Sequence, residues 1–104
     1  MPPVSVVIIT QNEADNIRNA LESVQWADDI VVVDSGSTDD TIQIAKQFTD
    51  RIVSHKWAGY GAQKNYGASL AAHDWILSLD ADERISSTLA EEIRLLLENE
   101  PTAT

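Results

Sequence analysis

The sequence predicts an α/β fold with a mainly parallel sheet and helices on both of its faces. Four short apolar runs rich in β-branched residues alternate along the chain with four segments of helical periodicity. One run, Ile30 to Val33, is apolar at every position, which is typical of a strand buried on both faces of a parallel sheet. Strands that alternate with helices favour right-handed βαβ crossovers, and therefore this class of fold.

The predicted strands and the first helix follow directly from these patterns. The strands are expected at the four apolar runs, Val4 to Ile9, Ile30 to Val33, Arg51 to Ser54 and Trp75 to Leu79. The first helix is indicated by apolar residues at the i, i+3, i+4, i+7 spacing of one buried stripe, namely Ile17, Ala20, Leu21 and Val24. Asn12, followed three residues later by Asp15, is its predicted N-terminal cap.

Three further helices complete the predicted order. The second begins near Asp39 and Asp40, which place acidic groups in its first turn, and it buries Ile44, Ala45 and Phe48. The third covers about Ala62 to Ala72 and is rich in small residues. The fourth follows Ser86 or Ser87 and carries an apolar face of Leu89, Ile93, Leu96 and Leu97. The polar segment Glu100 to Thr104 follows it, and we expect the whole chain to be the first part of a larger domain.

Composition limits the possible functions. A chain of 104 residues with 43% hydrophobic side chains can bury the core of one domain. The net charge of −10 argues against non-specific binding to nucleic acid, and an anionic ligand would need a cation or a cluster of donors. The absence of cysteine excludes disulfides and thiolate metal sites and fits a reducing compartment. No signal peptide is recognisable, and the first apolar run is too short to cross a bilayer, so we expect a cytoplasmic protein.

Three polar segments lie where predicted strands end. They are Thr10 to Glu13, Asp34 to Asp40 and Asp80 to Glu83. In open parallel sheets the ligand binds beyond the carboxyl ends of the strands, so the three segments are expected on one rim. A turn or a helix cap would account for any one of them alone. We expect Asp34 and Asp80 at neighbouring strand ends, sharing one site.

Asp80-Ala81-Asp82 is the most informative of these segments. Where the chain turns after a buried strand, two carboxylates one residue apart can face the same cation. Hard oxygen ligands without His or Cys suit Mg²⁺ or Mn²⁺. Two carboxylates cannot complete an octahedral shell, so a bound diphosphate and water would supply the remaining ligands. Such a cation would also let an acidic chain bind an anion.

Taken together, four segments resemble the family-two inverting glycosyltransferases with the GT-A fold. The segments are Val4 to Glu13, Val31 to Thr41, Gly59 to Gly67 and Trp75 to Glu83. The similarity is greatest with the bacterial lipopolysaccharide-core, glucosyltransferase-like branch, which has a similar Gln-Lys-Asn segment and a similar Leu-Asp-Ala-Asp-Glu. The resemblance covers nearly the whole chain and implies the Rossmann-like, nucleotide-sugar-binding half of a GT-A fold over residues 1–104.

The resemblance also implies a role for individual residues. Thr10, Asn12 and Glu13 would border the nucleoside, with Glu13 near the ribose or base, and Asp34 would accept a hydrogen bond from N3–H of a uracil. Lys64 matches a family position that carries a basic residue near the nucleotide. Asp80 would contact the ribose, and Asp82 would bind Mn²⁺ or Mg²⁺. The residues alone agree for Asp34, because a carboxylate suits an N–H donor, whereas Lys64 alone would be a solvated side chain.

The family's reaction transfers a sugar from a nucleotide-diphosphate donor, here expected to be UDP-linked, to an acceptor with inversion. A carboxylate base activates the acceptor hydroxyl while the metal stabilises the departing diphosphate. In the family that base lies further along the chain than Asp82, so no catalytic residue is assigned here. The branch implies a glycan or glycolipid acceptor of lipopolysaccharide biosynthesis. Peripheral association with the inner face of the cytoplasmic membrane would come through a C-terminal part beyond these residues.

Alternative functions are less well matched. A haloacid-dehalogenase-type phosphatase needs Thr or Val two residues after the second aspartate of its motif, where this chain has Arg84. A nucleotidyltransferase would need a glycine-rich basic loop in place of Thr10 to Glu13, and Gly59 to Gly61 lacks the third glycine of a dinucleotide fingerprint. A non-catalytic nucleotide-binding or scaffold module of the same fold stays open.

The histidines and tryptophans carry no assigned chemistry. His55 and His73 are isolated in the sequence and are interpreted as surface or packing residues. Trp26, Trp57 and Trp75 are interpreted as core and rim packing, although Trp57, close before Gly59, could line a cleft.

Overall fold

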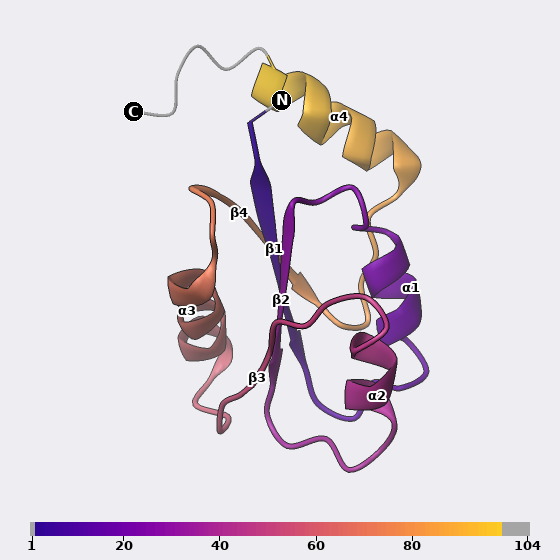
Figure 1. Cartoon of the computed structure of the whole chain (residues 1–104), viewed down its shortest axis with the longest axis vertical. Helices are drawn as coiled ribbons and strands as arrows, with labels where there is room; N and C mark the ends of the chain where they lie inside the picture. Colours follow the sequence, from indigo (N-terminus) through magenta and orange to yellow (C-terminus); the bar gives the residue numbers. More distant parts are fainter. Residues whose placement is uncertain (1, 99–104) are drawn as a thin grey trace.

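The computed structural model describes residues 2–98, which form a parallel four-stranded sheet with helices on both faces (Figure 1). The strands are β1 (Val4–Thr10), β2 (Asp29–Asp34), β3 (Ile52–Ser54) and β4 (Trp75–Asp80). The helices are α1 (Ile17–Glu22), α2 (Thr41–Ala45), α3 (Tyr60–Leu70) and α4 (Ser87–Glu98). All eight predicted elements are present in the predicted order, which confirms the α/β fold. The polar segment 100–104 lies outside the described residues.

The sheet has the strand order β3-β2-β1-β4, and all three pairs of strands are parallel. The first strand of the chain is therefore an inner strand, and all seven of its residues are buried. In the register of the sheet, Thr10 of β1 pairs with Asp34 of β2, and Ile9 of β1 pairs with Asp80 of β4. The carboxyl ends of these three strands consequently meet at one edge of the sheet.

Each face of the sheet has its own apolar cluster. On one face, Val6, Ile8 and Val32 pack with residues of α1 and α2, and Ala90 and Ile93 of α4 pack against the same cluster. On the other face, Val7, Ile9, Val31 and Val33 pack against Tyr66 and Leu70 of α3. Figure 1 shows α3 alone on its side of the sheet, opposite α1 and α2.

Helix α3 lies unusually close to β1 because of one glycine. A Cβ atom added to Gly67 would lie 2.2 Å from Cγ1 of Val7 and 3.1 Å from Cγ2 of Val33. Such distances are far inside van der Waals contact, so any larger residue would push the helix away from the sheet. The position of α3, and of everything at its N-terminal end, depends on this contact.

The predicted cap of α1 and the predicted acidic first turn of α2 are wrong, although α2 does begin next to Asp40, as predicted. Asn12 does not cap α1, which begins at Ile17 after Asn16. Asn12 instead has a φ of 52° and its Oδ1 accepts a hydrogen bond from the N–H of Thr38. Helix α2 begins at Thr41 and has no acidic residue in its first turn. Asp39 lies before the helix and accepts hydrogen bonds from the N–H and the hydroxyl of Thr41. It therefore stabilises the loop that precedes α2 and does not act as an acidic residue of the first helical turn.

The predicted apolar faces of α2 and α4 are only partly confirmed. Ala45 is buried and Ile44 and Phe48 are partly buried, although Phe48 lies beyond the end of α2. On α4, Leu97 is buried but Leu89 is 40% exposed and Leu96 is 66% exposed. No helix within residues 2–98 has the length and apolar character needed to span a membrane.

Candidate functional site

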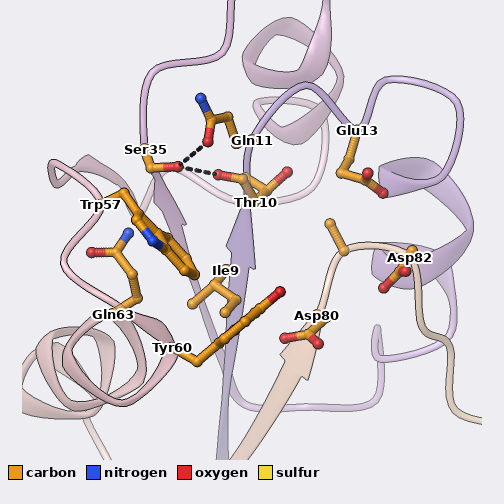
Figure 2. Close-up of a pocket in the computed structure, with 11 residues that line it drawn as sticks. Ile9, Thr10, Gln11, Glu13, Ser35, Trp57, Tyr60, Gln63, Asp80 and Asp82 are labelled. Carbon is orange, nitrogen blue, oxygen red and sulfur yellow. Dashed lines mark hydrogen bonds between the residues drawn. The ribbon is translucent and has the colours of Figure 1, made fainter.

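A cleft of about 320 Å³ lies at the carboxyl edge of the sheet, between the ends of β1 and β4 and the first turn of α3 (Figure 2). It is lined by residues from all three predicted rim segments and from the segment before and within α3, namely Ile9, Thr10, Gln11, Glu13, Ser35, Trp57, Tyr60, Gln63, Asp80, Ala81 and Asp82. The predicted convergence of the three rim segments at one cleft is therefore correct.

Asp80 and Asp82 form the wall of the cleft that follows β4 (Figure 2). The turn between them is held by its backbone, because the N–H of Ala81 donates to the carbonyl of Ile9 at 3.1 Å and the N–H of Asp80 donates to Oε1 of Glu83 at 2.8 Å. Asp82 is exposed. Oδ1 of Asp80 is buried and, within the described part of the chain, has no hydrogen-bond partner. A buried carboxylate oxygen without a donor is rare, and it indicates a place for a ligand.

Lys64 lies beside this carboxylate. Its Nζ is 4.0 Å from Oδ1 of Asp80, too far for a hydrogen bond but close enough for an ion pair between α3 and the end of β4. Both side chains are more than a third exposed, so the pair contributes little to stability. The predicted basic residue is thus next to one of the two predicted acidic ligand-binding residues.

The opposite end of the cleft is neutral and polar. Ser35 follows β2, and its N–H donates to the carbonyl of Thr10 at 3.1 Å. The hydroxyl of Ser35 also donates to Oε1 of Gln11 at 3.1 Å, as Figure 2 shows. Oγ1 of Thr10 is buried and has no hydrogen-bond partner among residues 2–98. This end therefore offers hydroxyl and amide groups to a ligand rather than charges.

Asp34 does not share this cleft with Asp80, contrary to the prediction. Strand β1 lies between β2 and β4, so the two aspartates are not on adjacent strands. Asp34 is level with Thr10 whereas Asp80 is level with Ile9, one position earlier. Because successive residues of a strand point to opposite faces, the two carboxylates leave the sheet on opposite faces.

The side chain of Asp34 is committed to the turn that follows β2. It is 2% exposed, and it accepts hydrogen bonds from the N–H groups of Gly36 and Ser37 at 2.9 and 2.8 Å and from the hydroxyl of Ser37. The neighbouring residue, Ser35, lines the cleft in the place predicted for Asp34. The predicted contact between Asp34 and a uracil stays a prediction, and it would require these hydrogen bonds to open.

The first two rim segments are joined to each other by side chains. The N–H of Asn12 donates to Oγ of Ser37 at 2.8 Å, and Oδ1 of Asn12 accepts from the N–H of Thr38 at 2.8 Å. Asn12 therefore joins two loops and does not line the cleft, whereas Glu13 does. The N–H of Glu13 donates to Oγ1 of Thr41 at 2.9 Å. The hydroxyl of Thr41 in turn lowers the pKa of Asp39 by donating to its carboxylate.

His55 and Gln63 hold together the segment between β3 and α3. Gln63 is 1% exposed, its Nε2 donates to the carbonyl of His55 at 3.2 Å, and its Oε1 is hydrogen-bonded to Nδ1 of His55. The ring of His55 stacks on Tyr66 with centroids 4.1 Å apart. The interpretation of His55 as a packing residue is consistent with these contacts.

Sequence reasoning did not single out Ser35, Tyr60 or Gln63 as residues of the cleft. Gln63 and Ser35 belonged to motifs that were noted, but only the folded structure shows that these residues of the two motifs face the cleft, Ser35 from the end of β2 and Gln63 from α3. Tyr60 carried no signal of its own, apart from its place between two glycines.

The donor set fits a hard cation only in part. Within residues 2–98, no group of three or more His, Cys, Asp or Glu side chains could hold a metal ion. Asp82 offers an exposed carboxylate beside Asp80, and oxygen ligands of this kind suit Mg²⁺ or Mn²⁺. A cation at Asp82 would therefore take most of its ligands from phosphate oxygens and water, as Mg²⁺ commonly does.

In open parallel α/β sheets, ligands bind in the crevice beyond the carboxyl ends of the strands, and the acidic cleft of this chain lies there. Residues 5–104 match the family model described as Glycosyl transferase family 2. The chain belongs to this family.

Individual relatives agree with the family. The chain is 45% identical over 97 residues to a Rickettsia felis protein described as an uncharacterized glycosyltransferase, covering 92% of this chain and 34% of that protein. It is 35% identical over 100 residues to the Rhizobium meliloti lipopolysaccharide core biosynthesis glycosyltransferase LpsC, covering 91% of this chain and 37% of the relative. The chain thus spans about a third of the length of the curated relatives it matches.

Solved structures show the same fold. S. aureus TarS in complex with UDP is similar with a TM-score of 0.73 and 27% identity, covering 92% of this chain and 32% of that chain. Glucosyl-3-phosphoglycerate synthase from Mycobacterium tuberculosis, in complex with Mn²⁺, UDP and glucosyl-3-phosphoglycerate, is similar with a TM-score of 0.68 and 25% identity, covering 80% of this chain and 36% of that chain.

Proposed function

We propose that the protein of which these residues are part transfers a sugar from a UDP-linked donor to a glycan or glycolipid acceptor of the cell envelope, and that this chain binds the donor. The observation that carries the proposal is the cleft at the carboxyl edge of the sheet, where Oδ1 of Asp80 is buried without a hydrogen-bond partner among the described residues. Similarity to a lipopolysaccharide core glycosyltransferase and to two UDP complexes supports the acceptor and donor classes.

The charge distribution of the cleft favours one orientation of the bound donor. The nucleoside would lie at the neutral end, beside Thr10, Gln11 and Ser35, and the diphosphate at the end formed by Asp80 and Asp82. The orphan oxygen of Asp80 would accept a hydrogen bond from a ribose hydroxyl, because a buried acceptor is stabilised by a donor. Lys64, beside Asp80, would add a positive charge close to the diphosphate.

Asp82 would bind Mn²⁺ or Mg²⁺ through its exposed carboxylate. When bound, this cation would neutralise the diphosphate and stabilise it as the leaving group. Displacement of the diphosphate by an acceptor hydroxyl in one step would invert the anomeric carbon. A chain of net charge −10 needs such a cation to bind an anion well.

No general base is assigned among these residues. Among the described residues beyond Glu83, the acidic ones are Glu91, Glu92 and Glu98, which lie on α4, and none of these three lines the cleft. Two of them, Glu91 and Glu98, form ion pairs with Arg94. We therefore expect the chain to bind donor without transferring sugar, and we expect the base in a part of the protein beyond this chain. The absence of cysteine supports a cytoplasmic site for the reaction.

The test is a calorimetric titration of the wild-type chain with UDP, CDP, ADP and GDP, each with and without Mn²⁺. We expect UDP to bind most tightly and Mn²⁺ to strengthen its binding. Equal affinities for all four nucleotides, or UDP binding that is indifferent to Mn²⁺, would contradict the proposal. Glycosylation of an acceptor by this chain alone would show that the base lies within it.

A further inference from the structure

Two exposed aromatic side chains line the cleft beside α3. Trp57 is 45% exposed and Tyr60 is 63% exposed. Such exposure is unusual, because large aromatic side chains are usually buried in cores or interfaces. Their rings meet edge to face, with centroids 4.8 Å apart and an interplanar angle of 89°. Among the described residues that line the cleft, these two are the only aromatic ones. The pair therefore presents aromatic surface to the cleft that no protein atom covers.

The aromatic pair is held in place by the segment around it. Gly59 lies between the two residues and has a φ of 100°, which allows the turn that brings the rings together. The N–H of His55 donates to the carbonyl of Asp34 at 2.9 Å, so the segment is tied to the end of β2. Gln63, buried at the start of α3, donates back to the carbonyl of His55. The two rings are thus positioned before any ligand binds, which lowers the entropic cost of binding.

The position of Trp57 points to the part of the donor that it contacts. Figure 2 shows Trp57 on the side of Ser35 and Gln63, while Asp80 and Asp82 lie on the other side of the cleft. If the diphosphate lies at the two carboxylates, the nucleoside lies toward Trp57. The planar part of a nucleoside is its base, and every nucleobase has a π-face that can stack on an aromatic ring.

We propose that Trp57, supported by Tyr60, stacks on the nucleobase of the donor. The inference rests on the proposed function and adds to it the residue that binds the face of the base. Ser35 and Gln11 would then contact the edge of the base, because their hydroxyl and amide groups lie at the same end of the cleft. Stacking tolerates any base, whereas hydrogen bonds at the edge distinguish one base from another. Trp57 supplies affinity in this arrangement, and Ser35 and Gln11 supply selectivity.

The experiment compares the wild-type chain with Trp57→Leu and Trp57→Phe by calorimetry in the presence of Mn²⁺. The probes are UDP, UMP, UDP-glucose and inorganic pyrophosphate. Trp57→Leu should weaken UDP and UMP roughly tenfold, within the range measured for loss of one base-stacking contact, and leave pyrophosphate binding unchanged. Trp57→Phe keeps an aromatic ring and should retain most of the affinity. Leu96→Ala, which removes exposed apolar surface on α4, is the matched control and should bind as the wild type does.

The outcomes separate this inference from the proposed function. If the wild-type chain binds UDP and the Trp57→Leu variant binds it with equal affinity, the stacking contact alone is overturned. A loss confined to UDP-glucose, with UDP unaffected, would also overturn it, because Trp57 would then contact the sugar of the donor. Weaker pyrophosphate binding in Trp57→Leu would show that the substitution disturbs the carboxylate end of the cleft, and it too would overturn the proposal. A wild-type chain that binds no uridine nucleotide would overturn the proposed function itself.

Discussion

The turn after β2 and the turn after β4 are both acidic and both begin with an aspartate at the carboxyl end of a strand that pairs with β1. In the first, Asp34 and Asp39 accept hydrogen bonds from backbone N–H groups and from hydroxyl groups. In the second, Asp82 is exposed and Asp80 has a buried oxygen without a partner among residues 2–98. Carboxylates whose acceptor capacity is filled by the protein hold the loop together, and those left unfilled are available to a ligand.

The largest expected effect tests the second turn. Asp82→Asn removes the negative charge proposed to bind the cation, and an ion pair at about 4 Å is worth roughly 4 kcal/mol at an effective dielectric constant near 20. The affinity for UDP in Mn²⁺ should therefore fall at least a hundredfold, while binding without metal and thermal stability change little. Calorimetry with and without Mn²⁺ measures this. Glu92→Gln, an exposed acid-to-amide change on α4, is the control, and an unchanged metal dependence in Asp82→Asn would remove Asp82 from the metal site.

The next effect should appear at Asp34, and in stability rather than in binding. Asp34→Ala leaves the N–H groups of Gly36 and Ser37 and the hydroxyl of Ser37 without their acceptor, which we expect to cost about 2–4 kcal/mol of unfolding free energy. Urea denaturation measures the loss. The preference for UDP over CDP should survive in the folded fraction. A stable Asp34→Ala variant that had lost this preference would show that Asp34 contacts the base after all.

A smaller effect is expected where the two loops are joined. Asn12→Ala removes the acceptor for the N–H of Thr38 and places alanine at a φ of 52°, so it should cost about 1–2 kcal/mol of unfolding free energy. Asn12→Gly tolerates the positive φ but lacks the acceptor, and comparing the two variants in urea separates the causes. If Asn12→Gly is as stable as the wild type, the hydrogen bond to Thr38 contributes nothing and only the conformation matters.

The smallest effect concerns pH. Hydrogen bonds, the hydroxyl of Thr41 foremost, hold the pKa of Asp39 below its ordinary value. Because the folded pKa is the lower one, the stabilisation is fully present above the unfolded pKa of about 4 and is lost as the pH falls through the folded value. Asp39→Asn should therefore lose less stability than the wild type as the pH is lowered through and below the ordinary carboxyl pKa of about 4. Urea denaturation at several pH values measures this, and an equal loss of unfolding free energy in the two proteins as the pH falls would contradict the assignment.

The pH comparison has one further group to account for. Burial raises the pKa of Asp29, but hydrogen bonds from the N–H of Ala72 and the hydroxyl of Ser5, together with Arg51, outweigh it and hold the pKa low. Asp29 titrates in both proteins, so both lose stability in acid. Only the difference between the wild type and Asp39→Asn reports on the turn after β2.

The strands could be predicted to within one or two residues because buried, β-branched runs leave few alternatives. The predicted strand Ile30 to Val33 became Asp29–Asp34, and the predicted Trp75 to Leu79 became Trp75–Asp80. The convergence of three polar segments on one rim was also predictable, because it follows from a parallel sheet alone. What the pattern could not supply was the order of the strands, and with it the position of β1 between the two aspartates.

The direction in which each side chain points could not be predicted from the sequence either, because it also depends on how the elements pair and pack. Asp34 and Ser35 are both polar and adjacent, and only the pairing of Asp34 with Thr10 decides which of them faces the cleft. Asn12 was assigned as a helix cap from its residue type, yet asparagine also tolerates a positive φ, and it uses that conformation here. Leu96 follows the helical period of α4 but is exposed, because periodicity does not state what covers the face.

The central place of β1 has a consequence for synthesis of the protein. Val4 pairs with Trp75, so β1 cannot complete its hydrogen bonds until β4, which is synthesised later, has followed it. During that interval one backbone edge of an almost wholly apolar strand is open to other chains. Pairing between such distant segments is slow, because the entropy cost of closing a long loop comes before the stabilising contacts form. A nascent chain that stops short of β4 should therefore be prone to aggregation and in need of a chaperone, even though β1, β2 and α1 are already complete.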